Sequence, residues 1–410
     1  MDKKLRNRIL FTLGMLSIYL FGTNLTVPTV NANISTESLG FLNTLSLLGG
    51  GSLEKMSIFS MGVGPYITAG IVIQLLSMDV IPTLNEWTKD GENGKRKIEK
   101  TTRYLGFVLA FVQALSLTYG FDKQYHILES GTFSSYMFVT IVLTAGSMVL
   151  VWLGDMISKR GIGSGMSLII VTGIISRIPA TLFETLMILG DGFNALVMFT
   201  LYVLAYLLVI VAVIVVEKAV KKISLQSTKT STMTTGGNIN HLPLKLNNAS
   251  VIPVILAQAV LSAPMIMLSF INYGWYEKLN KYLSLTHPVG LTIYAVLIIV
   301  FCFFYTYLQM DPKKMSENLK KSHMFIPGIR QGEETTKYLK DTLNKLTTAG
   351  SILLVILALI PFILTKFINI STVSALGGTG VILIVGIALE TVEQIKQQNT
   401  EKNYRGLLYD

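Results

Sequence analysis

Residues 194–216 read NALVMFTLYVLAYLLVIVAVIVV, a run without a single Asp, Glu, Lys or Arg. A helix of this length, rising about 1.5 Å per residue, crosses the roughly 30 Å hydrocarbon core of a bilayer. Backbone amides in hydrocarbon must pair within their own segment, so a spanning run of this kind folds as an α-helix. The stretch therefore predicts an integral membrane protein.

Nine further apolar runs lie along the 410-residue chain. Only 14% of its residues are charged, whereas soluble domains hold about 25%. The second and seventh runs each open with a proline between aliphatic residues, Pro65 and Pro253, a pairing typical of inverted repeats. We expect an all-α membrane protein of ten transmembrane helices in two pseudo-symmetric inverted halves, residues 1–190 and 191–410. The runs lie at residues 9–29, 64–78, 104–120, 135–154, 165–176, 194–216, 251–272, 289–309, 349–367 and 379–391.

Lysine and arginine residues predict the orientation. With both termini in the cytoplasm, all but six of the 34 Lys and Arg residues face the cytoplasm, as the positive-inside rule requires. We expect a multi-pass protein of the cell membrane whose largest basic loops, residues 217–250 and 310–348, are cytoplasmic. Such loops suit anionic lipids or an acidic cytosolic protein. The six outer residues are Lys55, Lys123, Arg177, Lys278, Lys281 and Lys366.

Residues 35–62 do not fit a simple spanning helix. Leu39–Leu48 is apolar but too short to cross a bilayer, and three consecutive glycines, Gly49 to Gly51, follow it. Short apolar segments broken by glycine and proline are typical of a re-entrant element, which is tolerated only where protein buries it or where it lines a cavity. An external amphipathic loop is the alternative that spacing alone leaves open.

No pattern for catalysis, metal binding or a bound cofactor occurs in the sequence. The segment 91–95 lacks the spacing and the Ser or Thr of a phosphate-binding loop. Cys302 is the single cysteine, so a disulfide within the chain is excluded. The centres of the apolar runs hold no charge, which argues against a proton- or sodium-coupled transporter, because such proteins keep an ionisable relay inside the membrane. Energy for any transport must then come from a partner.

Three amide side chains fall within apolar runs. They occupy the second, third and seventh runs, and an amide in lipid is expected to pair with another group across a helix interface. Weak contacts of this kind make a seam that can open. A permanent contact between neighbouring helices is the alternative. The residues are Gln74, Gln113 and Gln258.

Five motifs follow one another along the chain, and together with the ten runs they resemble the SecY family of protein-conducting channels. The resemblance covers nearly the whole sequence. In order, the motifs are Ser57-Ile58-Phe59-Ser60 continuing through Pro65-Tyr66-Ile67 to Ile73-Gln74-Leu75-Leu76; Trp152-Leu153-Gly154-Asp155 followed by Arg160-Gly161-Ile162-Gly163-Ser164-Gly165-Met166-Ser167; His241-Leu242-Pro243-Leu244-Lys245 before Val251-Ile252-Pro253; Phe325-Ile326-Pro327-Gly328-Ile329-Arg330 with Thr336, Tyr338 and Leu339; and Gly377-Gly378-Thr379.

The resemblance implies a polypeptide-conducting channel with no catalytic activity of its own. A ring of aliphatic side chains would close the pore and offer ions no polar ligand: Val63, Ile67, Ile170, Ile174, Ile255 and Leu383. The re-entrant segment near residues 41–53 would be a plug on the exterior side, carried by Phe41, Leu45, Leu48, Gly49, Gly50 and Gly51. Spans two and three against spans seven and eight would form a lateral gate, with Gln74, Gln113 and Gln258 as its polar seam.

The same resemblance implies the partners. A cytosolic motor ATPase of the SecA type would dock on the basic loops and drive secretory preproteins through the channel. A SecE-like subunit and small accessory subunits would complete the assembly within the lipid bilayer, and no nucleic acid, metal or cofactor is implied. The residues assigned to docking are Arg330, Lys218, Lys221 and Lys222.

Three departures from the family pattern bear on the role of the chain. Residues 216–222 lack the Arg-Arg-Ile-Pro-Val-Gln-Tyr type of signature found in general-secretion members, Glu54-Lys55 replaces a basic pair, and the external loops are short. These departures resemble the accessory branch of Gram-positive bacteria, which works with an accessory SecA to export large serine-rich glycosylated adhesins. A divergent member serving general secretion is the alternative. A small-solute secondary transporter and a membrane scaffold or insertase subunit without an open pore are the more distant ones.

Overall fold

The computed structural model describes residues 3–30, 49–77, 81–128, 130–190, 192–227, 240–271, 282–283, 285, 287–368 and 378–409. Each of the ten predicted apolar runs falls on a helix in this part of the chain, so hydropathy alone located all ten. These helices are α1 (Lys3–Thr23), α3 (Gly64–Leu76), α5 (Gly91–Tyr125), α6 (Phe133–Arg160), α7 (Gly165–Leu189), α8 (Phe193–Lys218), α9 (Ile252–Ile271), α11 (Pro288–Gln309), α13 (Glu333–Ile368) and α14 (Gly378–Tyr409).

Several helices are longer than the apolar runs that predicted them. α13 begins well inside the segment 310–348, so the prediction that this segment is a loop is wrong in part, and α5 begins at Gly91, ahead of its apolar run at 104–120. α7 continues past residue 176 to Leu189, although Pro179 lies within it. α3 stays short at 13 residues. Among the described residues, six helices are long and apolar enough to cross a membrane: α5, α6, α7, α8, α11 and α13.

The basic segment 217–250 contains a β-hairpin rather than an irregular loop. β1 (Val220–Ser227) pairs antiparallel with β2 (Asn240–Lys245), and β1 also pairs with the short β3 (Met324–Phe325). β2 is an edge strand, which tolerates its Pro243 because an edge needs fewer ladder donors. Buried Ile223, Leu225 and Leu244 hold the hairpin against α13. The all-α prediction therefore holds for the helical body, with one small sheet added.

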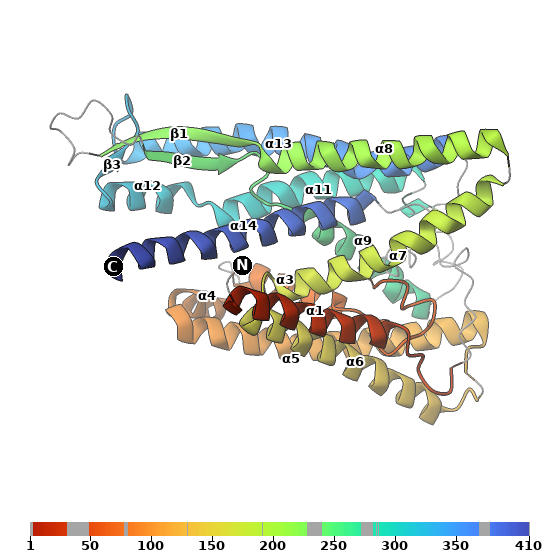
Figure 1. Ribbon diagram of the computed structural model, residues 1–410. Coiled ribbons are helices and arrows are strands. Elements are labelled where there is room, and N and C mark those ends of the chain that lie inside the picture. Colours follow the sequence, from red (N-terminus) through yellow and green to blue (C-terminus); the bar gives the residue numbers. More distant parts are fainter. Residues whose placement is uncertain are drawn as a thin grey trace.

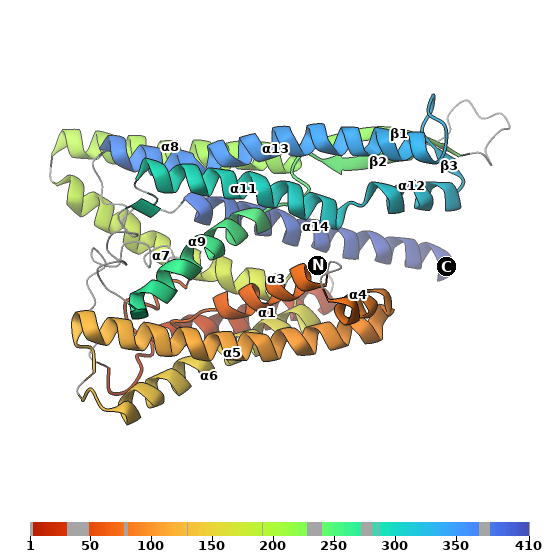
Figure 2. The same ribbon diagram turned by 180° about the vertical axis from the view of Figure 1, so that it is seen from behind.

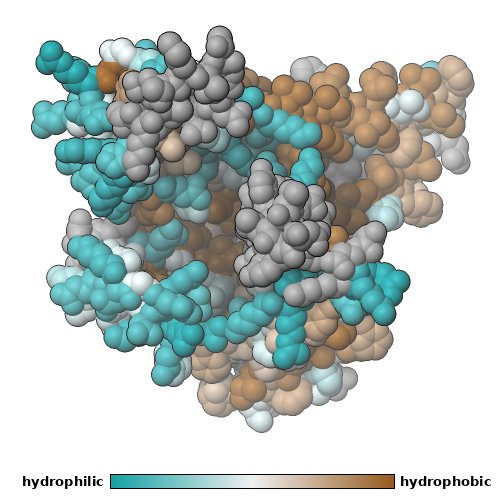
Figure 3. Space-filling model, turned by 60° about the vertical axis from the view of Figure 1, so that its left-hand side comes forward, coloured by the Kyte–Doolittle hydropathy of each residue, from teal (hydrophilic) through white to brown (hydrophobic). Residues whose placement is uncertain are grey.

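The polar elements gather at one end of a long helical body (Figures 1 and 2). α4 (Pro82–Lys89), α12 (Pro312–Lys321) and the sheet all lie at the end that also carries both termini. Hydrophilic residues cover that end in Figure 3, and hydrophobic residues occupy the flanks of the body beyond it. The distribution matches a multi-pass protein with one strongly polar side.

Two groups of helices face one another in Figures 1 and 2. α1, α3, α5 and α6 lie in the lower part of both views, while α8, α11 and α13 lie in the upper part; α7 and α9 run between the two parts. One continuous apolar core joins them, drawing buried side chains from α1 and α6 as well as from α7, α8, α9, α11, α13 and α14. The inverted relation between residues 1–190 and 191–410 stays a prediction.

Candidate functional site

The six residues expected to form the pore ring come together in this core, from four helices. Val63 directly precedes α3 and Ile67 lies on it, while α7 supplies Ile170 and Ile174. α9 contributes Ile255 and α14 contributes Leu383. Four of the six are nearly inaccessible, with exposed fractions of 4% for Val63, 7% for Ile170, 7% for Ile174 and 1% for Leu383. Ile67 and Ile255 are partly buried and pack against the same cluster.

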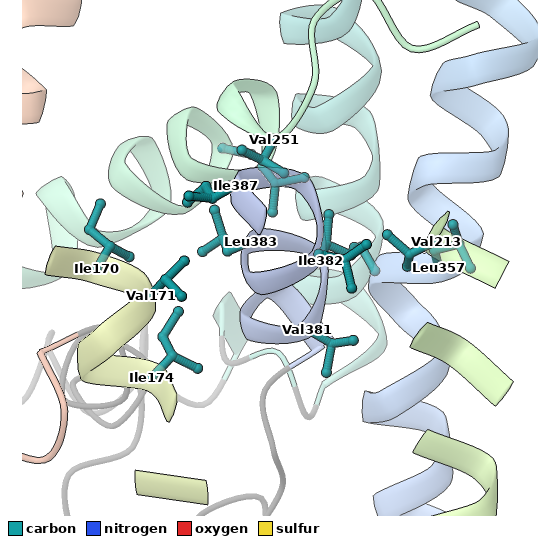
Figure 4. Close-up of a cluster of buried hydrophobic side chains, with 14 of the residues drawn as sticks. Ile170, Val171, Ile174, Val213, Val251, Leu357, Val381, Ile382, Leu383 and Ile387 are labelled. Carbon is teal, nitrogen blue, oxygen red and sulfur yellow. The ribbon is translucent and has the colours of Figure 1, made fainter. Parts of the chain in front are cut away.

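Close helix packing allows this convergence. In Figure 4 the Leu383 side chain projects from α14 toward α7, where Ile170, Val171 and Ile174 lie. Gly380, one turn before Leu383, permits the approach, since a Cβ built there would lie 3.0 Å from the Cγ2 of Ile174. With a larger residue at this position, the Ile174 side chain would have to shift by a few tenths of an ångström.

A small cavity adjoins the ring. Its volume is about 90 Å³, counted as the space open to the centres of water-sized molecules, which holds a few waters and no polypeptide. Val63, Ile67, Ile170 and Ile255 line it, whereas Ile174 and Leu383 do not. No charged side chain occurs in its described lining. The four aliphatic side chains offer an ion no ligand to replace its hydration shell, and the polar side chains in the lining, Ser60, Thr68, Gln113 and Gln258, are all uncharged.

Two of the three predicted amides meet at this cavity. Gln113 on α5 and Gln258 on α9 both line it, beside Thr68 of α3. Gln258 is 4% exposed, and its Nε2 finds no hydrogen-bond partner among the described residues. Since α9 packs on α5 and α3 here, the interface contains a buried amide nitrogen without a described partner, and the seam that can open stays a prediction. Gln74 does not take part, because it lies exposed near the end of α3.

The predicted plug is described only at its glycines. Phe41, Leu45 and Leu48 lie outside the described residues. Gly50 and Gly51 have φ values of +70° and +76°, in the left-handed region that favours glycine. A Cβ on Gly50 would lie 3.0 Å from the Cα of Gly173 on α7, so the backbone of this segment rests directly on that helix. Gly49 lines the cavity, which places the end of the segment beside the ring.

Arg177 is a residue that sequence reasoning placed in an external loop and the structure places inside α7. Its guanidinium Nη2 lies 2.5 Å from Oε1 of Glu54, and the two side chains are 8% and 18% exposed. The statement that no span holds an interior charge is therefore wrong for α7. A signal was available, because Ile170, Ile174, Arg177 and Thr181 follow the helical period and all four are buried.

The residues assigned to docking lie at the polar end. Lys218, Lys221 and Lys222 are exposed where α8 passes into β1, and Arg330 is exposed in the turn between β3 and α13. One apolar cluster that includes Ile326 beneath β1 and β3 holds the two segments in a single unit. Basic side chains from distant parts of the chain thus belong to one packed unit.

The residues that the structure describes also bear on metal binding. No group of three His, Cys, Asp or Glu side chains among these described residues is placed to hold a metal ion. The fold and the site together define a multi-pass helical membrane protein whose helices close around an apolar constriction.

Comparisons with known proteins identify the family. The SecY family model matches residues 57–392. The protein translocase subunit SecY of Bacillus subtilis (strain 168) is 42% identical over 416 residues, covering 98% of this chain and 96% of its own. The subunit of the same name from Staphylococcus epidermidis (strain ATCC 35984) is 41% identical over 416 residues, again 98% of this chain and 96% of its own. The chain belongs to the SecY family.

Solved structures support the fold. A structure described as "The structure of a protein conducting channel" aligns with a TM-score of 0.70 and 23% identity, covering 97% of this chain and 94% of that one. A Sec61 channel from a canine ribosome–channel complex aligns with a TM-score of 0.68 and 21% identity, covering 97% and 94%. At this level of identity the likeness shows a shared fold.

Proposed function

We propose that this chain is the central subunit of a protein translocation channel, passing secretory proteins across the plasma membrane without catalysing a reaction itself. The observation that carries the proposal is that six aliphatic residues meet in one apolar core, where four of them (Val63, Ile67, Ile170 and Ile255) line an uncharged cavity. Relatives that are about two-fifths identical over nearly the whole chain carry the name protein translocase subunit SecY, which supports it.

The ring explains how such a channel conducts a polypeptide but not ions. When the pore is empty, Val63, Ile170 and Leu383 are packed against apolar neighbours and leave no polar ligand for an ion. Aliphatic side chains adapt to a chain of varied shape, because dispersion contacts are not directional. A passing polypeptide would thus fill the opening that the ring closes in its absence.

Gln113 and Gln258 give the channel a way to open sideways. They belong to α5 and α9, whose contact we assign to the lateral gate together with α3 and α11. An amide that is buried without a partner destabilises the closed interface, by about 1–3 kcal/mol for such a group. A hydrophobic signal sequence would insert here and leave toward lipid.

The basic end supplies the orientation and the motor site. We place both termini in the cytoplasm because the polar end carries most of the Lys and Arg residues. Arg330 and Lys218, Lys221 and Lys222 would then face a SecA-type motor ATPase, which supplies the energy. A SecE-like subunit and small accessory subunits are the expected membrane partners.

For the role within the cell, we propose an accessory translocase that exports serine-rich glycosylated surface adhesins. The departures at residues 216–222 and at Glu54-Lys55 support this role. General secretion is the second candidate, and the 42% identity to the Bacillus subtilis subunit over nearly the full length favours it. Complementation separates the two: growth of a strain depleted of its general SecY would support general secretion, whereas export of the adhesin alone would support the accessory role.

Ion conductance tests the channel itself. Membrane vesicles bearing the translocase are fused to a planar bilayer, and the chain lacking residues 41–53 is compared with the parent. Loss of the plug should give a lasting leak. A deletion variant that inserts normally and stays silent would contradict the channel, leaving the transporter or the scaffold.

A further inference from the structure

The chain between the plug glycines and α3 contains a contact that no pore, gate or docking role explains. Arg177 lies midway along α7 and pairs with Glu54 at 2.5 Å, both largely buried. An ionisable side chain within a membrane-spanning helix is expensive and usually functional. The sequence predicted Arg177 in an external loop and Glu54 in the re-entrant segment, so their pairing is a property of the folded chain.

The geometry allows the pair of Glu54 and Arg177 to hold residues 49–51 against α7. A Cβ built on Gly51 would overlap the Arg177 guanidinium, which therefore lies across the backbone of Gly51. Gly50 rests on Gly173 and lies close to Ser176 of the same helix. The Arg177 side chain thus contacts Gly51 while the backbone of α7 contacts Gly50.

Glu54 is held firmly enough to anchor the far end of Arg177. Its neighbours Leu53 and Met56 are 1% and 0% exposed in an apolar cluster with α5 and α6. Ser60 donates a hydrogen bond of 2.8 Å to the carbonyl oxygen of Ser52, which closes the turn. The ion pair therefore connects Glu54, which is fixed beside α5 and α6, to α7 through the Arg177 side chain, which contacts Gly51.

A buried ion pair suits a switch better than a permanent joint. Removing two charges from water offsets most of their attraction, so such pairs add little net stability. Arg177 is also satisfied only in part, since its Nε finds no partner among the described residues. Water entering an opening pore would hydrate both charges and weaken their attraction. The ion pair between Glu54 and Arg177 is therefore stable while water is excluded from the site and weak once water enters it.

We infer that Glu54, Arg177 and Gly51 form an autoinhibitory clasp, which holds residues 49–51 against α7 in the closed channel and releases them when water and a polypeptide enter. The inference rests on the proposed channel function. Gly49 lines the cavity next to Val63 and Ile170, so a released segment would uncover the ring.

Charge variants test the clasp by conductance in planar bilayers fused with membrane vesicles that bear the whole translocase. Glu54→Gln and Arg177→Gln should each raise the open fraction on the order of tenfold, equivalent to about 1.4 kcal/mol. The reciprocal exchange, Glu54→Arg with Arg177→Glu, should return it toward the parent value. Lys55→Gln is the matched control, since Lys55 is exposed and bonds to Asn24 instead.

A covalent lock tests whether the segment must leave α7. A Cβ on Gly50 would lie 3.1 Å from Oγ of Ser176, close to the roughly 3 Å that disulfide geometry sets between one Cβ and the opposite sulfur. Gly50→Cys with Ser176→Cys, in a Cys302→Ser background, should export only under reducing conditions, and the reduced double variant is the control for the strain of a side chain at the φ of +70°. Export at the parent rate with the bond intact would overturn the clasp.

The outcomes separate this inference from the function on which it rests. If the charge variants conduct no more ions than the parent, while the variant lacking residues 41–53 does leak, the clasp is overturned and the channel function is retained. A silent deletion would overturn the channel and the clasp with it. If Arg177 variants fail to accumulate, the Glu54 variants decide alone, because Glu54 lies outside the helices.

Discussion

Replacing Ile170 with asparagine should hold the channel open. Ile170 is 7% exposed in the closed ring, and removing an isoleucine from such surroundings forfeits about 1.5–3 kcal/mol. A buried amide without a full set of partners adds about 1–3 kcal/mol to the penalty. Gln113 and Gln258 line the same cavity and offer partial pairing, so we take the low end of both ranges, about 2.5 kcal/mol in total.

That penalty applies only while the ring is dry. In a water-filled pore the asparagine is hydrated, so Ile170→Asn should raise the ratio of open to closed channels on the order of 100-fold. Single-channel recording in planar bilayers measures the ratio directly. Ile175→Asn is the control, because Ile175 is 47% exposed on the outer face of the same helix. An asparagine there should have the same free energy in the open and the closed channel. A variant at Ile170 that inserts normally and conducts no more than this control would refute the reasoning.

Three further changes have distinct outcomes. Gly146→Val should lower thermal stability in detergent by about 1–3 kcal/mol, because a Cβ there would overlap the carbonyl oxygen of Ile58; an unchanged melting temperature would contradict that packing. Gln258→Leu removes the unpaired amide from the closed gate, so preproteins with weak signal sequences should be exported about tenfold more slowly in pulse-chase assays, and equal rates would argue against a gate there. Arg330→Glu should impair export while membrane insertion stays normal, and unchanged secretion would remove Arg330 from motor docking.

The ten helices were predictable because the property that defines them is local. Residues 194–216 must satisfy their backbone within one segment, whatever surrounds them, and α8 spans Phe193–Lys218 as that argument requires. The ends were less predictable. α13 begins at Glu333 rather than near residue 349, because a helix continues into water wherever apolar residues on one of its faces still pack on a neighbour, as Leu339 and Leu343 do.

Arg177 shows how a single charged residue leads a hydropathy prediction to end a helix too early. The apolar run ends at residue 176, but α7 continues because Glu54 compensates the guanidinium that follows. That compensation comes from a segment more than a hundred residues earlier in the chain and is invisible to any window of sequence. The buried helical period from Ile170 to Thr181 was visible and pointed the other way.

The β-hairpin was predictable from the alternation of apolar and polar residues that is typical of a strand. Ile223 and Leu225 alternate with exposed residues in β1, as in a half-buried strand. The candidate site was predictable only in part. Gln113 and Gln258 line one cavity and Gln74 does not, because the packing of α9 on α5 determines which residues share that cavity. Sequence names the polar residues in the spans, and tertiary contact selects among them.

A crosslink to a stalled preprotein tests the central claim most directly. In a Cys302→Ser background, a lone cysteine replaces Ile170, and a secretory chain carrying one cysteine is halted in mid-export. The account predicts a disulfide between the two, and none when the lone cysteine replaces the lipid-facing Ile175 instead. Absence of the adduct at residue 170, in cells where a general SecY crosslinks the same chain, would show that the polypeptide does not pass through this constriction.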